Sequence, residues 1–302
     1  MSTQSNKNIE IKSIIDSTGL FPTNTPIIKP IEPPFKWIGG KRRFIKEITK
    51  LMPNNYTIFY ELFFGAGALS FSLQPKNLII NDFNPELINF YQVVKNNVDD
   101  LIDILKTYSI SKEFFYSLRN LDRDKEQFDK LTNIERAARI FYLIIYNFNS
   151  SLESNLKGQI SISPSPKCLK NIKLENQFKK IQNISDYLKL NNVTILNKDC
   201  NDILKNITDK NCFIYLDPPY YLINKKSRNG KNAYYGNIFD ESDQIKLKES
   251  CDSLTKRGIK FLQSNSNCEF IKELYKDYSI VEVGIFNPMS KKHVIEVFIK
   301  NY

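Results

Sequence analysis

Two short apolar runs in the first third of the chain constrain its architecture most. Residues 59–64 (FYELFF) and 78–82 (LIIND) each lead into a turn and then into a stretch with helical periodicity. Strands that alternate with helices in this way predict βαβ units, and such units imply a parallel sheet, because a parallel connection needs a crossover. We therefore expect an α/β fold.

Strand patterns return later in the chain, after a long stretch without them. The later strands are predicted over 193–199, 212–220, 259–266, 279–286 and 293–302. Because both ends of the chain supply strands, we expect all seven to join one mostly parallel sheet. Between the two groups, apolar residues recur with helical spacing, which predicts an inserted helical region. The clearest helical stretches are 101–108, 112–121 and 135–148.

Two segments are predicted to form no regular element. Residues 1–34 contain Pro22, Pro26 and three more prolines, a density that excludes a helix interior or a central strand, so we expect an extended arm. Residues 222–238 are polar, basic and rich in Gly and Asn, which indicates a basic loop.

The charge balance favours a polyanionic partner. The 302 residues include 43 lysines and arginines against 33 aspartates and glutamates, a net charge of +10. Nucleic acid is the first candidate partner, and an anionic membrane surface is the second. The alternative is that the positive charge only makes the protein surface soluble and binds no polyanion. No run approaches the roughly 20 apolar residues of a membrane span, and the polar N-terminus is no signal peptide, so we expect a cytoplasmic protein.

Histidine and cysteine usage narrows the chemistry. A single histidine, His293, cannot build a His-rich metal site or a relay of several histidines. The five cysteines lie at least 12 residues apart, which excludes CxxC clips and favours reduced intracellular thiols. We therefore expect no metal site.

Two turns after the first predicted strands are candidates for a nucleotide-like ligand. Glycines in the segment from Phe64 through Gly65 to Gly67 would let a ligand approach the backbone, although a merely structural turn explains them equally well. Asp82, at the tip of the next strand, could accept the hydroxyls of a ribose or could instead cap the helix that starts near Pro85. Ser70 replaces the third glycine of a dinucleotide fingerprint, which weighs against a nicotinamide enzyme.

The tetrapeptide Asp217-Pro218-Pro219-Tyr220 is the most specific feature. It ends an apolar strand, and its prolines stiffen the backbone and leave the Pro218 carbonyl free to accept a hydrogen bond. The Asp217 carboxylate and this carbonyl give two acceptors for one amino group, and Tyr220 adds a stacking surface. The set suits a planar heterocycle with an exocyclic NH2 group, whose nitrogen becomes more nucleophilic when both its N–H groups donate.

These motifs, in this order, resemble the Dam-type DNA adenine-N6 methyltransferases of the D12 class, alpha group. The resemblance extends from Phe35 to the C-terminus and includes a segment (FKWIGGK, 35–41) similar to the family's F-x-K-W-x-G-G-K. It implies a Rossmann-like methyltransferase sheet with an inserted helical target-recognition domain, and S-adenosyl-L-methionine as cofactor. By position it assigns cofactor binding to Trp37, Lys41, Phe64, Gly65, Gly67, Asp82, Asp199 and Asp217, and catalysis to Asp217, Pro218, Pro219 and Tyr220.

The resemblance also implies how the DNA is handled. The target adenine must be flipped out of the duplex, after which Tyr220 stacks on it and its N6 takes the methyl group. The segment 149–161 resembles the family's target-reading stretch, but Glu153 stands where relatives carry an arginine. Because a glutamate can only accept a hydrogen bond, for example from a cytosine amine, recognition of the usual GATC target is left open.

The function expected from the sequence is therefore site-specific methylation of adenine N6 in double-stranded DNA. N4-cytosine methylation and a catalytically silent DNA-binding protein of the same fold stay as alternatives. We expect a monomer or weak dimer with no membrane partner, and a cognate restriction endonuclease is a further candidate partner. The expected domains are an arm (1–34), a catalytic domain (35–95 with 190–302) and a helical target-recognition domain (96–189).

Overall fold

The computed structural model of the chain describes residues 29–37, 39–148, 152–155, 157–221, 233–234, 237–287 and 292–302. Most of the arm predicted over 1–34 and most of the loop predicted over 222–238 lie outside the described residues. The prediction that residues 222–238 form no regular element is wrong for the described part of that loop, where β5 (Ala233–Tyr234) pairs antiparallel with β6 (Asn237–Ile238).

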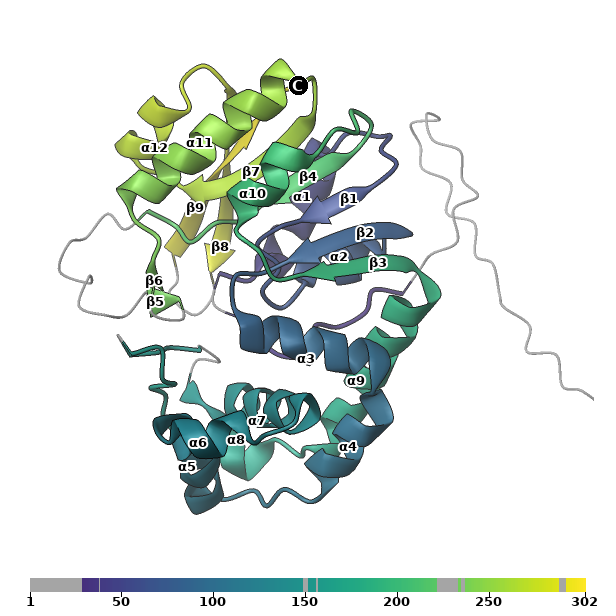
Figure 1. The fold of residues 1–302 in the computed structure, drawn as a ribbon. Helices are drawn as coiled ribbons and strands as arrows, with labels where there is room; N and C mark the ends of the chain where they lie inside the picture. The colour runs from purple at the N-terminus through teal and green to yellow at the C-terminus, as the bar shows by residue number, and fades with distance from the viewer. Residues whose placement is uncertain are drawn as a thin grey trace, which may run out of the picture.

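All seven predicted strands are present, and they form one sheet in the order β3-β2-β1-β4-β7-β9-β8 (Figure 1). Neighbours are parallel from β3 to β7, whereas β9 runs antiparallel to both β7 and β8. The prediction of a seven-stranded, mostly parallel sheet is thus confirmed. The strands are β1 (Phe59–Glu61), β2 (Asn77–Asn81), β3 (Asn192–Leu196), β4 (Phe213–Leu216), β7 (Lys260–Ser266), β8 (Ser279–Asn287) and β9 (Lys292–Lys300).

The strand order fixes where a ligand can bind. From β1 the chain moves to one side of the sheet through β2 and β3, and from β4 it moves to the other side through β7. The loops that leave the carboxyl ends of β1 and β4 therefore diverge, which opens a crevice between two neighbouring strands. The Gly65–Gly67 turn and the Asp217 tetrapeptide follow these two strands directly.

The central strands are buried on both faces, which explains their uninterrupted apolar sequences. In β4, Phe213 and Tyr215 face one core, and Ile214 and Leu216 face the other. The second core lies under α10, α11 and α12, which cover one face of the sheet (Figure 1). These helices are α10 (Cys200–Asn206), α11 (Glu241–Lys256) and α12 (Glu269–Leu274), and the other face carries α1 (Ile45–Leu51) and α2 (Ala68–Leu73).

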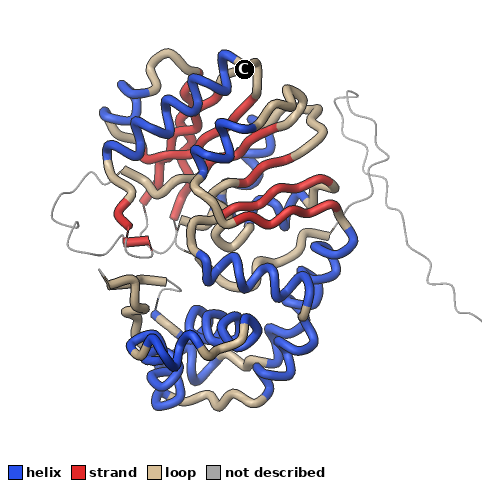
Figure 2. Tube along the Cα trace, in the orientation of Figure 1, coloured by secondary structure: helices blue, strands red, loops and turns tan. Residues whose placement is uncertain are grey.

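The predicted helical insertion is also present, and Figure 2 shows helices without strands filling the region below the β3 edge of the sheet. A capping box between Thr132 and Glu135 starts its central, almost entirely buried helix α7. None of the described helices is long and apolar enough to cross a membrane. The helices of this region are α3 (Pro85–Asn96), α4 (Val98–Lys106), α5 (Lys112–Asn120), η2 (Leu121–Arg123), α6 (Lys125–Asp129), α7 (Asn133–Tyr146), α8 (Pro166–Asn171) and α9 (Glu175–Leu190).

Candidate functional site

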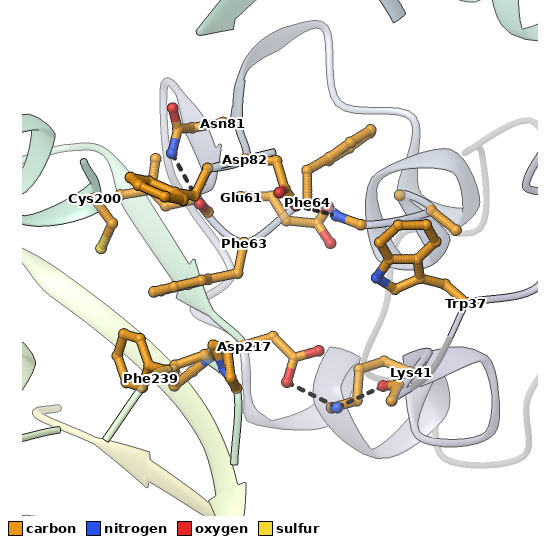
Figure 3. A pocket seen from close by; sticks show the side chains of 18 of the residues that line it. Trp37, Lys41, Glu61, Phe63, Phe64, Asn81, Asp82, Cys200, Asp217 and Phe239 are labelled. Atoms are coloured by element: carbon orange, nitrogen blue, oxygen red, sulfur yellow. Dashed lines mark hydrogen bonds and ion pairs between the residues drawn. The ribbon is translucent and has the colours of Figure 1, made fainter. Parts of the chain in front are cut away.

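The eleven residues predicted for cofactor binding and catalysis all line one cavity of about 620 Å³ at the carboxyl ends of β1, β2 and β4 (Figure 3). Segments far apart in the sequence meet there because parallel strands end at the same edge of the sheet. The structure thus brings the predicted set together. The residues are Trp37, Lys41, Phe64, Gly65, Gly67, Asp82, Asp199, Asp217, Pro218, Pro219 and Tyr220.

The glycine turn after β1 depends on the absence of side chains. Gly65 and Gly67 have φ angles of +50° and +67°, in the left-handed region that L-residues avoid. A Cβ on Gly65 would lie 2.8 Å from Cδ1 of Trp37, because the indole packs directly on this backbone. The Tyr91 hydroxyl donates to the Gly65 carbonyl over 2.9 Å and fixes the turn from below. The two glycines are therefore required by the packing of the turn itself.

Replacing Gly67 by alanine is expected to destabilise the protein far more than the same change at Gly258. Both glycines have a left-handed φ, so both variants incur about 1–2 kcal/mol of backbone strain. At Gly67 the new Cβ would also lie 2.7 Å from Cε2 of Phe71 and closer still to Phe64, whereas at Gly258 it meets nothing within 4 Å. Urea unfolding of both variants measures the difference, and equal losses would contradict the packing argument.

Asp82 accepts hydrogen bonds from backbone amides of two loops, the one after β1 and the one after β2. Gly65 N donates to its Oδ2 over 2.9 Å and Asn84 N donates to its Oδ1 over 3.0 Å. The cap of α3 is Asn84, whose side chain accepts from Glu86 N and Leu87 N, so the alternative that Asp82 caps this helix is wrong. Burial raises the pKa of Asp82 above its ordinary value, and the amide hydrogen bonds oppose that rise.

Asn81 joins three loops at the cavity, a role that the sequence did not reveal. Its amide nitrogen donates to the carbonyls of Leu62 and Lys198, each over 3.1 Å, and its Oδ1 accepts from Lys198 N over 2.9 Å. The loops after β1, β2 and β3 are held in register by one buried side chain. Asp199 is the next residue after Lys198, and it caps α10 by accepting a hydrogen bond from Asn201 N over 2.7 Å.

Glu61, the last residue of β1, is a buried carboxyl group on the cavity wall. It accepts from the backbone amide of Ser70 over 3.1 Å and from the Ser70 hydroxyl. Burial raises the pKa of Glu61 to about 8, against the effect of these two hydrogen bonds and of Lys41. Only an environment known from the fold could identify this group, because the sequence shows no more than a glutamate inside an apolar run.

We expect the stability of the protein to fall as the pH rises from about 4.5 to about 8, in part because of Glu61. In this window the folded chain keeps the Glu61 proton and the unfolded chain releases it, so the free energy of unfolding decreases by up to about 1.4 kcal/mol per pH unit. Glu61→Gln removes this contribution and should flatten the profile, while the exposed control Glu249→Gln should leave it unchanged. Thermal unfolding across this pH range compares the three proteins, and parallel profiles would refute the assignment.

The tetrapeptide after β4 is braced by polar contacts with β7 and α11. Gln244 Nε2 donates to the Pro219 carbonyl over 2.9 Å, and Ser264 Oγ donates to Asp217 Oδ1 over 2.7 Å. Lys41, almost completely buried, reaches the same Asp217 oxygen over 2.8 Å. From the described part of the chain, no donor reaches Asp217 Oδ2 or the Pro218 carbonyl. These are the two acceptors that the sequence analysis assigned to an amino group.

Aromatic side chains form the end of the cavity opposite Trp37 and Lys41 (Figure 3). Phe63 and Phe239 lie edge to face there, with ring centroids 6.1 Å apart. Neither residue was predicted from the sequence to belong to the site, although Phe63 lies inside the apolar run 59–64. A flat apolar slot of this kind suits a heteroaromatic ring.

The fold and this site are those of a methyltransferase that acts on an amino group. The chain belongs to the D12 class N6 adenine-specific DNA methyltransferase family, whose model matches residues 37–288. It is therefore an adenine-specific DNA methyltransferase, which uses a methyl donor and acts on DNA.

Three relatives illustrate the likeness. The Type II methyltransferase M1.LlaDCHI of Lactococcus lactis subsp. cremoris is 36% identical over 279 residues, covering 90% of this chain and 96% of the relative. The Type II methyltransferase M.MjaIII of Methanocaldococcus jannaschii is 32% identical over 298 residues, covering 90% and 99%. A DNA adenine methylase of Haemophilus influenzae is 28% identical over 277 residues, covering 89% and 91%.

Proposed function

We propose that the chain transfers the methyl group of S-adenosyl-L-methionine to N6 of an adenine flipped out of double-stranded DNA at a specific site. The observation that supports this best is the position of the two acceptors, Asp217 Oδ2 and the Pro218 carbonyl, on the wall of a cavity that also holds the glycine turn and Asp82. The two acceptors for an amino group and the residues suited to a nucleoside therefore lie in the same crevice.

The walls of the cavity fit the chemistry of S-adenosyl-L-methionine. Each Asp82 oxygen accepts one amide and keeps a lone pair for a ribose hydroxyl. The ammonium of Lys41, near Trp37, suits the carboxylate of the methionine part, and the aromatic end at Phe63 and Phe239 suits the adenine. Asp199 lines the same cavity. The cofactor supplies a methyl group made electrophilic by its sulfonium sulfur. We assign its contacts to Trp37, Lys41, Phe64, Gly65, Gly67, Asp82, Asp199 and Asp217.

The corner after β4 prepares the adenine amine for reaction. The lone pair of this amine is delocalised into the ring, which makes the nitrogen a poor nucleophile. Asp217 and the Pro218 carbonyl accept its two N–H groups and return electron density to nitrogen, because acceptors held in a buried site act strongly on developing charge. Pro219 keeps the corner rigid, and the ring of Tyr220 offers a face for the flipped base.

The division of the chain follows from the same proposal. We assign residues 35–95 and 190–302 to catalysis, residues 96–189 to target recognition, and residues 1–34 to an arm. The helical region carries a short hairpin in which Ser154 pairs with Ile160, and the Asn155 side chain holds its turn by accepting from Gln159 N over 3.0 Å. Glu153 lies at the base of this hairpin, where Ser161 N donates to its carbonyl over 2.8 Å. Its carboxylate is expected to read a base that offers a donor.

The partners beyond DNA belong to this proposal as well. Two of the relatives carry Type II methyltransferase names, which supports a cognate restriction endonuclease as a partner in the cell. We propose that the chain works as a monomer or weak dimer.

The decisive experiment identifies the modified nucleoside. Unmethylated DNA is incubated with the protein and methyl-labelled S-adenosyl-L-methionine, digested to nucleosides and separated. We expect the label in N6-methyladenosine alone. Label in N4-methylcytosine would support the cytosine alternative, and binding of DNA without any transfer would support the silent protein.

A further inference from the structure

Glu296 is a second carboxylate beside the Asp217 corner, and the reaction described so far does not use it. It lies on β9, where it pairs with Ser266 of β7 and Val283 of β8, and its side chain is 11% exposed. Its Oε2 accepts from the Tyr220 hydroxyl over 2.6 Å and lies 3.8 Å from the ammonium of Lys41. A charged residue in a buried strand position costs stability unless its partners compensate.

Lys41 lies over the Tyr220 ring, on which a target adenine would stack. Its ammonium bonds Asp217 Oδ1 over 2.8 Å and lies 4.7 Å from the centroid of the Tyr220 ring. It also donates to the Gly39 carbonyl over 2.7 Å, so the side chain is held in place from three directions. An adenine that donates to Asp217 Oδ2 and stacks on this face of the Tyr220 ring must therefore compete with the ammonium for the ring.

The displaced ammonium needs another carboxylate close by. Moving a buried cation away from its partner is strongly unfavourable when nothing else compensates the charge. Among the described residues, the carboxylates that pair with Lys41 are Asp217 and Glu296. A short movement toward Glu296 would free the Tyr220 ring while keeping the ammonium paired.

The contact with Tyr220 gives Glu296 a second effect. Burial and the neighbouring Asp217 and Glu296 carboxylates hold the pKa of Tyr220 well above its ordinary value, so the phenol keeps its proton and donates. A ring tethered through its hydroxyl cannot swing about its side-chain bonds. Its face then stays at one angle to the acceptors of the corner.

We propose that Glu296 is a positioning residue for methyl transfer, which tethers the ring of Tyr220 and takes up the Lys41 ammonium when the target adenine enters. The inference rests on the proposed function, because it assumes an adenine at the Asp217 corner. It predicts that loss of the charge and loss of the tether slow the reaction separately.

Two variants separate these effects. Glu296→Gln removes the charge but keeps an oxygen that can accept from Tyr220, and Tyr220→Phe removes the tether but keeps the ring and the charge. Single-turnover methylation is measured at saturating S-adenosyl-L-methionine, with a duplex cut from a position that the wild-type protein methylates, and duplex affinity is measured by anisotropy. We expect each variant to lose about tenfold in rate with duplex affinity within twofold. The control Glu282→Gln, on the neighbouring strand β8 and half exposed, should match the wild type.

The effect of Glu296→Gln on the rate is also measured in a Lys41→Met background, which distinguishes a positioning role from a merely structural one. Without the ammonium there is nothing for Glu296 to take up, so Glu296→Gln should change the rate less than twofold there. A rate within twofold of wild type for Glu296→Gln alone, or the same tenfold loss in both backgrounds, would overturn the inference. If the wild-type protein itself placed no methyl group on adenine, the proposed function would fail instead.

Discussion

Asp217→Ala is expected to reduce methyl transfer about a hundredfold to a thousandfold while duplex affinity changes less than about threefold. The variant removes one of the two acceptors for the adenine amine, and removing a single preorganised polar group from a reacting centre typically costs two to three orders of magnitude. It also removes the partner to which the buried Lys41 bonds over 2.8 Å, so the ammonium that remains is held less well. We expect contacts with DNA phosphates to supply most of the duplex affinity, so binding should persist in this variant.

Two companion variants make this result interpretable. Asp217→Asn keeps the volume and one acceptor oxygen, so it should fold like the wild type and still lose most of the rate. Asp277→Ala removes an exposed aspartate near the end of α12 and should leave the rate unchanged. Labelled methyl transfer measures activity and anisotropy measures binding. Turnover of Asp217→Ala within tenfold of wild type would remove Asp217 from the mechanism.

The strands and the site could be predicted from sequence for one common reason. Apolar runs that end abruptly in a polar or glycine-containing segment mark the carboxyl ends of parallel strands, and those ends converge. The prediction extended the first strand to Phe64, but β1 ends at Glu61. The apolar run continues to Phe64 because Leu62 enters the core and Phe63 and Phe64 line the cavity. Apolar side chains therefore extend three residues beyond the last strand-paired residue.

The rest of the site depends on contacts between distant residues. Tyr220 and Glu296 are 76 positions apart, and Asn81 bonds a carbonyl 117 positions away. In the sequence, Glu296 is one charged residue within an apolar strand pattern, and the pattern predicts the strand but not the neighbour of each side chain. Pairings of this kind follow only from strand order and register.

Arg139 is a further residue whose role no sequence pattern indicated. It lies in the middle of the apolar helix α7 and is 1% exposed. Its guanidinium donates to the carbonyls of Leu118 and Arg119 over 2.7 and 2.9 Å and pairs with Asp122 over 2.9 Å. Asp122 in turn accepts from Ile160 N over 2.7 Å, so the arginine holds the base of the hairpin proposed to read the DNA.

Arg139→Met is therefore expected to lower the free energy of unfolding by about 1–3 kcal/mol, because two carbonyls and the Asp122 carboxylate lose a buried donor while Arg123 still pairs with Asp122. The exposed control Arg42→Met should change it by less than about 1 kcal/mol. The double variant Asp122→Asn/Arg139→Met should lose less than the sum of the losses of the single variants Asp122→Asn and Arg139→Met if the pair acts as a unit. Urea unfolding followed by circular dichroism measures all four variants, and additive losses would show that the two residues stabilise the helical region independently.

The same pair supports the hairpin that is proposed to read the DNA. Methylation by Arg139→Met should therefore spread to positions that the wild-type protein leaves unmodified, and sequencing of the methylated positions would reveal this.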